Sequence, residues 1–275
     1  MTEKTAFRWY GGDGKLWRWK LPFLNRVPHD TYVEGFFGAG TMFFRKELAQ
    51  TNVVNDINGQ VTNFFRWLRS CPADLVNAIQ LTPYSRQEFI QAQLNRGAMT
   101  LDDARLFYVA TQQGRGRTGK VDPNEWLFQK APTRKSYASD FYNCHHLPAF
   151  ANKLRYAQIE SDHILKVLPR YSTPRTLYYL DPPYLNATRA DRHATTGYDC
   201  EMADTESHQQ LADAVLTTAG IFAIAHYRCE FYDDVYLGNG WSLETREVYK
   251  TQGNAGNTAT EALYLSPNCT PTKLF

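Results

Sequence analysis

The stretch TYVEGFFGAGTMFFRKELAQTNVVNDIN, residues 31–58, decides the fold class of this chain. Its opening TYVEGF is apolar and β-prone, and the FGAG that follows is typical of a turn. We expect a helix over TMFFRKELAQ, residues 41–50, and a second strand in the β-branched TNVVNDIN, residues 51–58. A strand, a glycine turn, a helix and a strand open a βαβ unit, so the sequence predicts a parallel sheet.

A long helical stretch interrupts this pattern. Helical character is expected over residues 60–70, 73–80, 86–94 and 102–111. The glycine-rich, basic QQGRGRTGKVDPNEW that follows, residues 112–126, favours an exposed loop. Helix and strand then alternate again through TLYYL, HQQLADAVLTT, GIFAIAHY and EALYLS. We therefore predict a doubly wound α/β sheet built from residues 1–59 and 151–275, with an inserted, mostly helical domain of residues 60–150.

The composition is that of an ordinary globular protein. Of 275 residues, 43% are hydrophobic and 21% are charged, and the length suits one large domain with an insertion. The N-terminal MTEKTAFRWYGG lacks the apolar segment of a secretory signal, and no apolar run approaches the roughly 20 residues that span a bilayer. We expect a cytoplasmic protein that does not contact a membrane.

The cysteines do not suggest a metal site. The chain has five of them, without a C-x-x-C pair, at positions Cys71, Cys144, Cys200, Cys229 and Cys269. The NCHHLP segment, residues 143–148, groups one cysteine with two histidines, but adjacent side chains point in different directions and converge poorly on one ion. We expect free thiols and no metal.

The glycine turn and the acid that follows it indicate a ligand site. Gly38 and Gly40 allow a ligand to approach the backbone closely, but TMFF follows them, so the G-x-G-x-x-G spacing of dinucleotide sites is not met. Asp56 ends the second strand sixteen residues after Gly40, where nucleotide-binding proteins place an acid for ribose hydroxyls. A simple turn aspartate is the alternative. Together, turn and acid favour a ligand that carries adenosine and need not carry phosphate.

The tetrapeptide DPPY, residues 181–184, follows the apolar strand TLYYL directly. A turn after a strand would explain it structurally. Chemically, the Asp181 carboxylate and the Pro182 carbonyl can both accept hydrogen bonds from a planar amino group, which makes its nitrogen a better nucleophile. The two prolines, Pro182 and Pro183, fix the backbone, and Tyr184 offers a ring on which a base can stack. A sulfonium methyl donor beside this group would be attacked in line.

These motifs make the chain resemble the Dam-like DNA adenine-N6 methyltransferases of the D12 class, the α-type group that uses S-adenosylmethionine. The resemblance rests on FRWYGGDGK, VEGFFGAG, NDIN, QIESDHILKVL and DPPY. Four further segments, DPPYLNATR, GYDCEM, FYDDVY and EALYLSPN, are similar to the phage and prophage branch. The resemblance implies a Rossmann-like methyltransferase sheet with an inserted target-recognition domain, an S-adenosylmethionine cofactor without metal, and double-stranded DNA as substrate.

The resemblance also assigns roles to residues. It implies that the cofactor is bound by Trp9, Lys15, Phe36, Gly38, Gly40, Asp56, Asp162 and Asp181. It implies that the catalytic residues are Asp181, Pro182, Pro183 and Tyr184. Purely structural alternatives are a core aromatic for Trp9, a solvated charge for Lys15 and a helix N-cap for Asp162.

Three departures from the family pattern stand out. GGDGK has two residues more than the usual GGK, Gly35 replaces a common proline, and AIAHY, residues 223–227, stands where serine or asparagine is common. We expect neither Gly35 nor AIAHY to touch the chemistry.

The stretch that comprises the predicted insertion and the six residues after it is basic, as DNA binding requires. Residues 60–156 hold thirteen basic and seven acidic side chains, a net charge of +6, whereas the whole chain carries +2. An enzyme that flips an adenine out of the duplex must hold the DNA backbone meanwhile. We expect phosphate contacts from Arg115, Arg117, Lys120, Arg134 and Lys135. A merely solvated loop is the alternative.

Other functions stay open at this point. N4 of cytosine is chemically close to N6 of adenine, so an N4-cytosine methyltransferase is the main alternative. A carbon-5 cytosine enzyme needs a cysteine that typically follows proline, and the chain has no Pro-Cys dipeptide. A catalytically inactive DNA-binding homologue would not need the intact DPPY. We expect an active, monomeric enzyme that acts alone or with a separate restriction enzyme.

Overall fold

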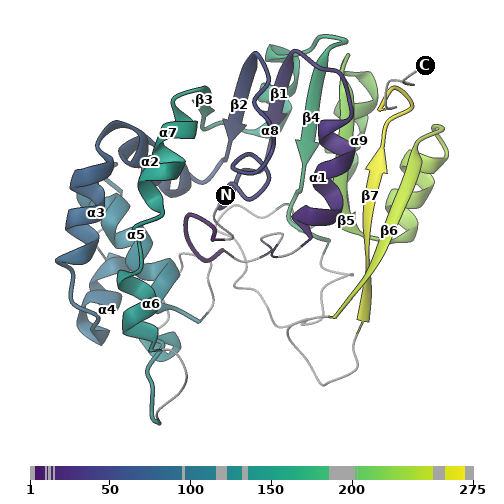
Figure 1. Cartoon of the computed structure of the whole chain (residues 1–275). Helices are drawn as coiled ribbons and strands as arrows, with labels where there is room; N and C mark the ends of the chain where they lie inside the picture. Colours follow the sequence, from purple (N-terminus) through teal and green to yellow (C-terminus); the bar gives the residue numbers. More distant parts are fainter. Residues whose placement is uncertain are drawn as a thin grey trace.

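The computed structural model describes residues 4–9, 11, 14, 16–94, 97–115, 123–131, 136–185, 202, 204–249 and 258–269. Within these residues a sheet of seven strands forms the centre, in the order β3-β2-β1-β4-β5-β7-β6 (Figure 1). The strands are β1 (Thr31–Glu34), β2 (Thr51–Asn55), β3 (Ala157–Glu160), β4 (Thr176–Leu180), β5 (Ile221–Tyr227), β6 (Ser242–Tyr249) and β7 (Thr258–Leu265).

The first five strands are parallel, which confirms the predicted sheet, and β7 runs antiparallel to both β5 and β6. The TLYYL of β4 is buried at every position, because β4 lies between β1 and β5 with helices on both faces. The sequence analysis missed β6. This strand is at the edge of the sheet and reads SLETREVY, so its charged residues hide the strand pattern.

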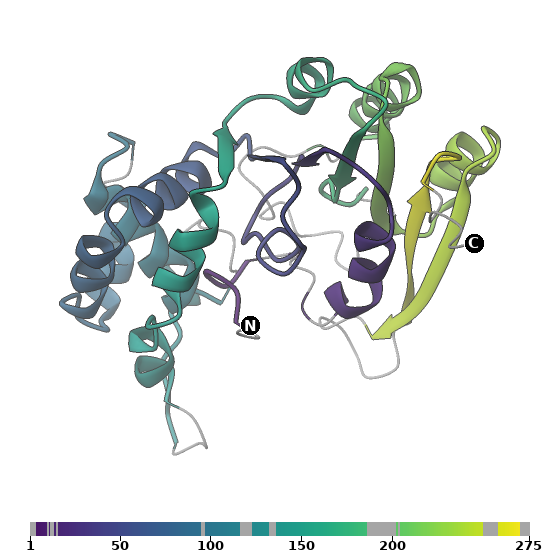
Figure 2. The same cartoon turned by 45° about the horizontal axis from the view of Figure 1, so that its top comes forward.

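Helices cover both faces of the sheet, as a doubly wound fold requires. α1 (Trp17–Asn25) lies on one face, and α8 (Ile164–Arg170) and α9 (Thr205–Thr217) lie on the other (Figure 2). Neighbouring residues of β4 point to opposite sides: Tyr179 belongs to the core on the α1 side and Tyr178 to the core that contains α8 and α9. After β5 the chain forms one short turn, α10 (Glu230–Tyr232), and a π-helical turn over Asp233–Leu237.

Six helices lie between β2 and β3 in the chain, and they gather beside β3 at one end of the sheet (Figures 1 and 2). They are α2 (Gly59–Ser70), α3 (Pro72–Gln80), α4 (Arg86–Leu94), α5 (Leu101–Gln113), α6 (Tyr137–Tyr142) and α7 (Leu147–Leu154), with a 3₁₀ turn at Pro123–Glu125. The first four confirm the helices expected from the sequence. We call these six helices and their connections the helical unit.

The helical unit and the sheet share one hydrophobic core. Phe7, from the N-terminal segment, packs with ring centroids 5.1 Å from Phe64 and 5.0 Å from Phe107. Phe37, after β1, lies 4.7 Å from Phe65 of α2. The division of the chain at residues 59/60 and 150/151 therefore stays a prediction, because the packing is continuous across it.

The helix expected over residues 41–50 is wrong. Residues 41–46 form turns and are buried on all sides, so they have no polar face to turn toward water as a surface helix would. The segment ends where the side-chain amide of Asn52 binds both backbone groups of Ala49, at 3.0 and 2.9 Å. A local side-chain contact thus replaces the helical hydrogen bonds there.

Among the residues described, no helix combines the length and apolar character that crossing a membrane requires.

The turn after β1 depends on a glycine, which can be tested against a matched position. Gly40 has φ +70°, and a Cβ there would lie 2.5 Å from the ring of Phe44 and 2.7 Å from that of Phe37. Gly240 has a similar φ of +77° but open space around it. Gly240→Ala should lower the free energy of unfolding by about 1–2 kcal/mol through backbone strain alone.

Gly40→Ala should cost about 1–3 kcal/mol more than that, because the methyl group crowds the aromatic core. Equilibrium unfolding in urea measures both values. Equal decreases in the free energy of unfolding for Gly40→Ala and Gly240→Ala would contradict the expected crowding at the glycine turn.

Candidate active site

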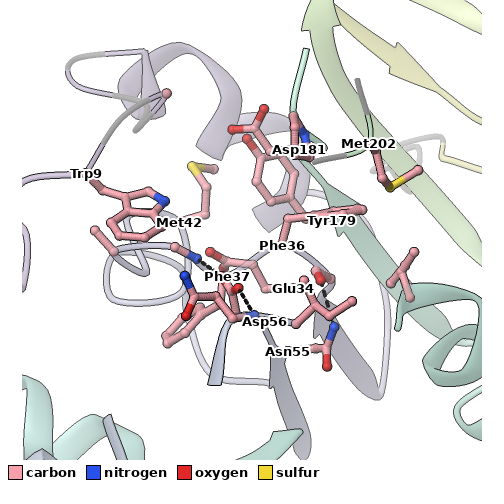
Figure 3. A pocket seen from close by; sticks show the side chains of 18 of the residues that line it. Trp9, Glu34, Phe36, Phe37, Met42, Asn55, Asp56, Tyr179, Asp181 and Met202 are labelled. Carbon is pink, nitrogen blue, oxygen red and sulfur yellow. Dashed lines mark hydrogen bonds between the residues drawn. The ribbon is translucent and has the colours of Figure 1, made fainter. Parts of the chain in front are cut away.

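A cavity of about 290 Å³ opens at the carboxyl edge of β1, β2 and β4. Strand order reverses between β1 and β4, and this is the place where open α/β sheets bind ligands. Seven of the predicted site residues line this one cavity, namely Trp9, Phe36, Gly38, Asp56, Asp162, Asp181 and Pro183. In Figure 3, Asp56 and Asp181 lie at opposite ends of the labelled residues, with Trp9 to one side.

Asp56 is fixed to the glycine turn. Its Oδ2 accepts the N–H of Gly38 at 2.8 Å, and its Oδ1 accepts the N–H of Asn58 at 2.9 Å. Burial raises the pKa of the Asp56 carboxyl to about 6, although both backbone donors oppose the shift. Each carboxylate oxygen can still accept a further hydrogen bond, so this acid suits a ligand with two hydroxyl groups.

Trp9 covers the glycine turn. Gly38 has φ +47°, and a Cβ there would lie 2.8 Å from Cδ1 of the Trp9 ring. The same ring packs at 5.6 Å from Phe7 and 5.8 Å from Phe107. Trp9 therefore lines the cavity and also packs against the aromatic core, and its predicted contact with the cofactor stays a prediction.

Asp162 lines the cavity, but its carboxylate binds cations of α8. It pairs with Arg170 at 2.6 Å and with Lys166 at 3.4 Å, and it accepts the N–H of His163 at 2.8 Å. The bond from Arg170, with these other donors, lowers the pKa of Asp162 to about 2. The N-cap alternative is wrong, because the residue that caps α8 is His163, whose Nδ1 accepts the N–H of Leu165.

The buried amide of Asn55 was missed by the sequence analysis. Its Nδ2 donates to the carbonyls of Gly35 at 3.0 Å and Asp162 at 3.1 Å, and its Oδ1 accepts the N–H of Asp162 at 3.0 Å. The residue thus joins the ends of β1 and β2 to the segment after β3. Its place beside Asp56 in NDIN was the only signal that the sequence offered.

The DPPY tetrapeptide, residues 181–184, follows the end of β4 directly. Asp181 and Pro183 line the cavity, as do Tyr179 and the nearly buried Glu34, whose Oε2 accepts the hydroxyl of Tyr32 at 2.9 Å. Pro182 is buried behind them and is not among the lining residues. Two further acids, Glu34 and Asp181, thus face the same space as Asp56 and Asp162.

Tyr184 points away from this cavity. Its hydroxyl donates to Oε1 of Glu261 at 2.7 Å, and its ring centroid lies 4.6 Å from those of His226 and Tyr227. The next residue, Leu185, donates its N–H to Nε2 of His226 at 3.0 Å. The tyrosine is therefore held on the β5 and β7 side of the motif, outside the lining of the cavity.

Gly35 and the end of AIAHY, expected to stay clear of the chemistry, lie close to the candidate site, and whether they affect the reaction stays untested. β4 and β5 pair in parallel with Leu180 opposite Ile224, so the end of β5 runs beside the tetrapeptide and brings His226 against Tyr184. Gly35 lines the cavity, and a Cβ there would lie 2.5 Å from Leu180.

Other predicted residues fall elsewhere. Gly40 is not part of the cavity lining; it closes the turn beneath, with its N–H bound to the carbonyl of Phe37 at 2.7 Å. Lys15 lies outside the described residues, as do the proposed DNA contacts Arg117, Lys120, Arg134 and Lys135. In the described part of the chain, no group of three histidine, cysteine or acidic residues could hold a metal ion.

Arg115 is described, and it lies in a cluster of cations and aromatic rings on the helical unit. Of the loop expected over residues 112–126, Gln112 and Gln113 belong to α5, Gly114 and Trp126 form an antiparallel bridge, and residues 116–122 lie outside the described part of the chain. Three exposed cations surround Phe128 beside it: Lys130 at 5.5 Å, Arg86 at 5.6 Å and Arg115 at 5.9 Å from the ring centroid. Arg86 also lies 4.9 Å from the ring of Trp126. We call these five side chains the Phe128 cluster.

Comparison with known proteins agrees with this geometry. The sequence model of the D12 class N6 adenine-specific DNA methyltransferases matches residues 9–253, most of the chain. The matched range includes the glycine turn, Asp56, Asp162 and the DPPY tetrapeptide. No curated protein matches the chain closely enough to serve as a relative. The family match nevertheless covers enough of the sequence to be decisive: the chain belongs to the D12 class of N6 adenine-specific DNA methyltransferases.

Proposed function

We propose that this adenine-N6 DNA methyltransferase binds S-adenosylmethionine in the cavity between Asp56 and Asp181 and methylates an adenine flipped out of duplex DNA at a specific sequence. The observation that carries the proposal is that one cavity has the half-buried acid Asp56 at the end of β2 and the DPPY acid Asp181 at the end of β4. We also propose that the enzyme is of the Dam-like α-type and of the phage branch, on the motifs quoted above.

The residues of the cavity fit this cofactor. Asp56 offers carboxylate oxygens to the two ribose hydroxyls, and the missing side chain of Gly38 makes room for the Trp9 ring at the wall of the cavity. Phe36, Ile57 and Ile164 give an apolar wall for the adenine and the thioether carbons. When bound, the cofactor supplies an electrophilic methyl group on a sulfonium.

The tetrapeptide prepares the acceptor. The Asp181 carboxylate and the Pro182 carbonyl accept hydrogen bonds from the two N–H groups of the adenine amino group, which localises the nitrogen lone pair. That lone pair then attacks the methyl carbon in line, and the carbon–sulfur bond breaks. Tyr184 holds the flipped base by stacking. A cytosine amino group would fit the same hydrogen bonds, so the product must be identified directly.

Asp181→Ala removes the acceptor of this hydrogen bond and should lower methyl transfer by at least about 10³-fold, while DNA binding persists. The assay measures tritiated methyl transfer to unmethylated plasmid, followed by nuclease digestion to identify the modified nucleoside. Asp30→Ala is a suitable control, because Asp30 forms an exposed pair with Arg175 at the opposite edge of the sheet. Substantial turnover by Asp181→Ala, or label on cytosine in the wild type, would contradict the proposal.

The raised pKa of Asp56 makes a prediction about pH. Ribose hydroxyls donate to the ionised carboxylate, and the folded protein loses this ionised form as the pH falls through about 6. The Kd for S-adenosylmethionine should therefore rise below pH 6, by up to about tenfold per pH unit. Isothermal titration calorimetry at several pH values between 5 and 6.5 measures this dependence.

Two variants distinguish the pH effect of Asp56 from that of Asp162. Asp56→Asn should bind more weakly at pH 6.5 and lose the pH dependence. Asp162→Asn should keep the pH dependence whatever its Kd, because the pKa of Asp162 is lowered to about 2 and the group stays charged throughout this range. A pH dependence that survives in Asp56→Asn would contradict the role of this residue.

We further propose that residues 60–150 recognise DNA and that the Phe128 cluster contacts its backbone. Three exposed cations supported on two aromatic rings form a basic surface with little freedom to move. Arg115 directly precedes the basic stretch 116–122 in the sequence, and we propose that Arg117 and Lys120 contact phosphates as well.

Replacing Arg86, Arg115 and Lys130 with alanine should weaken DNA binding for every sequence. The slope of log K against log salt concentration should become shallower by about 1 for each cation that contacts a phosphate. Fluorescence anisotropy with a labelled duplex at several salt concentrations measures the slope. Arg175→Ala, an exposed arginine away from the helical unit, is the control. An unchanged slope in the triple variant would show that the cluster does not contact phosphates.

A further inference from the structure

A buried ion pair lies beneath the catalytic tetrapeptide, and the proposed reaction does not use it. Lys20 of α1 and Glu261 of β7 meet at 2.9 Å, with side-chain exposures of 0% and 1%. They stand 241 residues apart in the sequence. Figure 1 shows how they can meet, because α1 lies across the sheet in front of β4 and β5, next to β7.

This pair contacts the tetrapeptide segment on both sides. Nζ of Lys20 donates to the hydroxyl of Tyr179 at 3.4 Å, two residues before Asp181. Oε1 of Glu261 accepts the hydroxyl of Tyr184 at 2.7 Å, three residues after Asp181. Tyr179 lines the cofactor cavity, and Tyr184 faces the other side. One ion pair therefore holds the residues that flank the catalytic acid.

Stability alone does not account for such a pair. Removing two charges from water is expensive, and well-packed apolar residues often serve a protein interior as well or better. What the pair does provide is a fixed direction: a short bond to the hydroxyl sets the long axis of the Tyr184 ring. The rings of His226 and Tyr227, both at 4.6 Å, then limit its tilt.

We infer that Lys20 and Glu261 are positioning residues that orient the Tyr184 ring for stacking on the target base. The inference rests on the proposed role of Tyr184. A ring that is already oriented loses little freedom when the base arrives, and the amino group then meets Asp181 at the right angle. Neither Lys20 nor Glu261 touches the substrate; both act through the tyrosine hydroxyl.

The test uses paired substitutions, because a single one would leave a buried charge without its partner. Lys20→Met/Glu261→Leu removes both charges and the acceptor for the Tyr184 hydroxyl. Lys20→Met/Glu261→Gln also removes both charges but keeps an amide oxygen as acceptor. We expect the first variant to lose up to about 100-fold in kcat, the loss typical of a small misplacement at a reacting centre. The KM for S-adenosylmethionine should change less than about twofold, and the glutamine variant should recover most of the activity.

A second measurement reports on the ring itself. 2-Aminopurine at the target position fluoresces when it leaves the duplex and is quenched when it stacks on an aromatic ring. The leucine variant should therefore give a brighter complex than the wild type, and the glutamine variant should resemble the wild type. Tyr184→Phe keeps the ring but lacks the hydroxyl, so it should behave like the leucine variant. Adding Tyr184→Phe to Lys20→Met/Glu261→Leu should lower kcat little further.

Arg175→Met/Asp30→Asn is the matched control, because it removes an exposed ion pair at the other edge of the sheet and should leave kcat and fluorescence unchanged.

Wild-type kcat and fluorescence in a folded leucine variant would overturn the inference. If that variant does not fold, Tyr184→Phe decides, and wild-type behaviour there would overturn it equally. If the wild type transfers no methyl group to adenine, the proposed function itself fails, which is a different result from variants that match an active wild type.

Discussion

The side-chain amide of Asn55 joins three separate segments of backbone at the carboxyl edge of the sheet, and the cavity depends on it. Through three hydrogen bonds it holds the end of β2 to Gly35 after β1 and to Asp162 after β3. These bonds satisfy buried polar groups that would otherwise be costly at the point where the strands separate. Because the segments cannot move independently, Asp56 and the glycine turn keep a fixed relation to the end of β4.

Asp56 and Asp162 both line the cavity, but their different surroundings shift their pKa values in opposite directions. Asp56 is half-buried and accepts two backbone N–H groups, and desolvation of its carboxyl raises its pKa to about 6. Asp162 is half-buried as well, but it pairs with Arg170 and Lys166, which lower its pKa to about 2. The first keeps acceptor capacity toward the cavity. The carboxylate of Asp162 binds Lys166 and Arg170 of α8, while its backbone C=O and N–H bond the side-chain amide of Asn55.

Features of the fold with a local sequence pattern could be predicted. The buried strands β1, β2 and β4, the helices α2 to α5, and the acids Asp56 and Asp181 all follow from short stretches of sequence. Prediction failed where burial or distant contacts decide. Residues 41–46 look helical by composition, but they are buried on every side and form turns. The contact of His226 with Tyr184 depends on the register of β4 and β5, and the Lys20–Glu261 pair depends on two elements at opposite ends of the chain. Neither leaves a signal in a single sequence.

That last pair has a consequence for how the protein is made. Lys20 leaves the ribosome early, and its partner belongs to the last strand, β7. The antiparallel pairing of β7 with β5 and β6 must therefore form before α1 has a counter-charge to receive its lysine. Before β7 is in place, packing α1 on the sheet would bury the Lys20 ammonium without the Glu261 carboxylate, so α1 packs less stably. A chain cut short before residue 261 would keep every motif in its first 250 residues but lack Glu261, the carboxylate that pairs with Lys20 and accepts the Tyr184 hydroxyl.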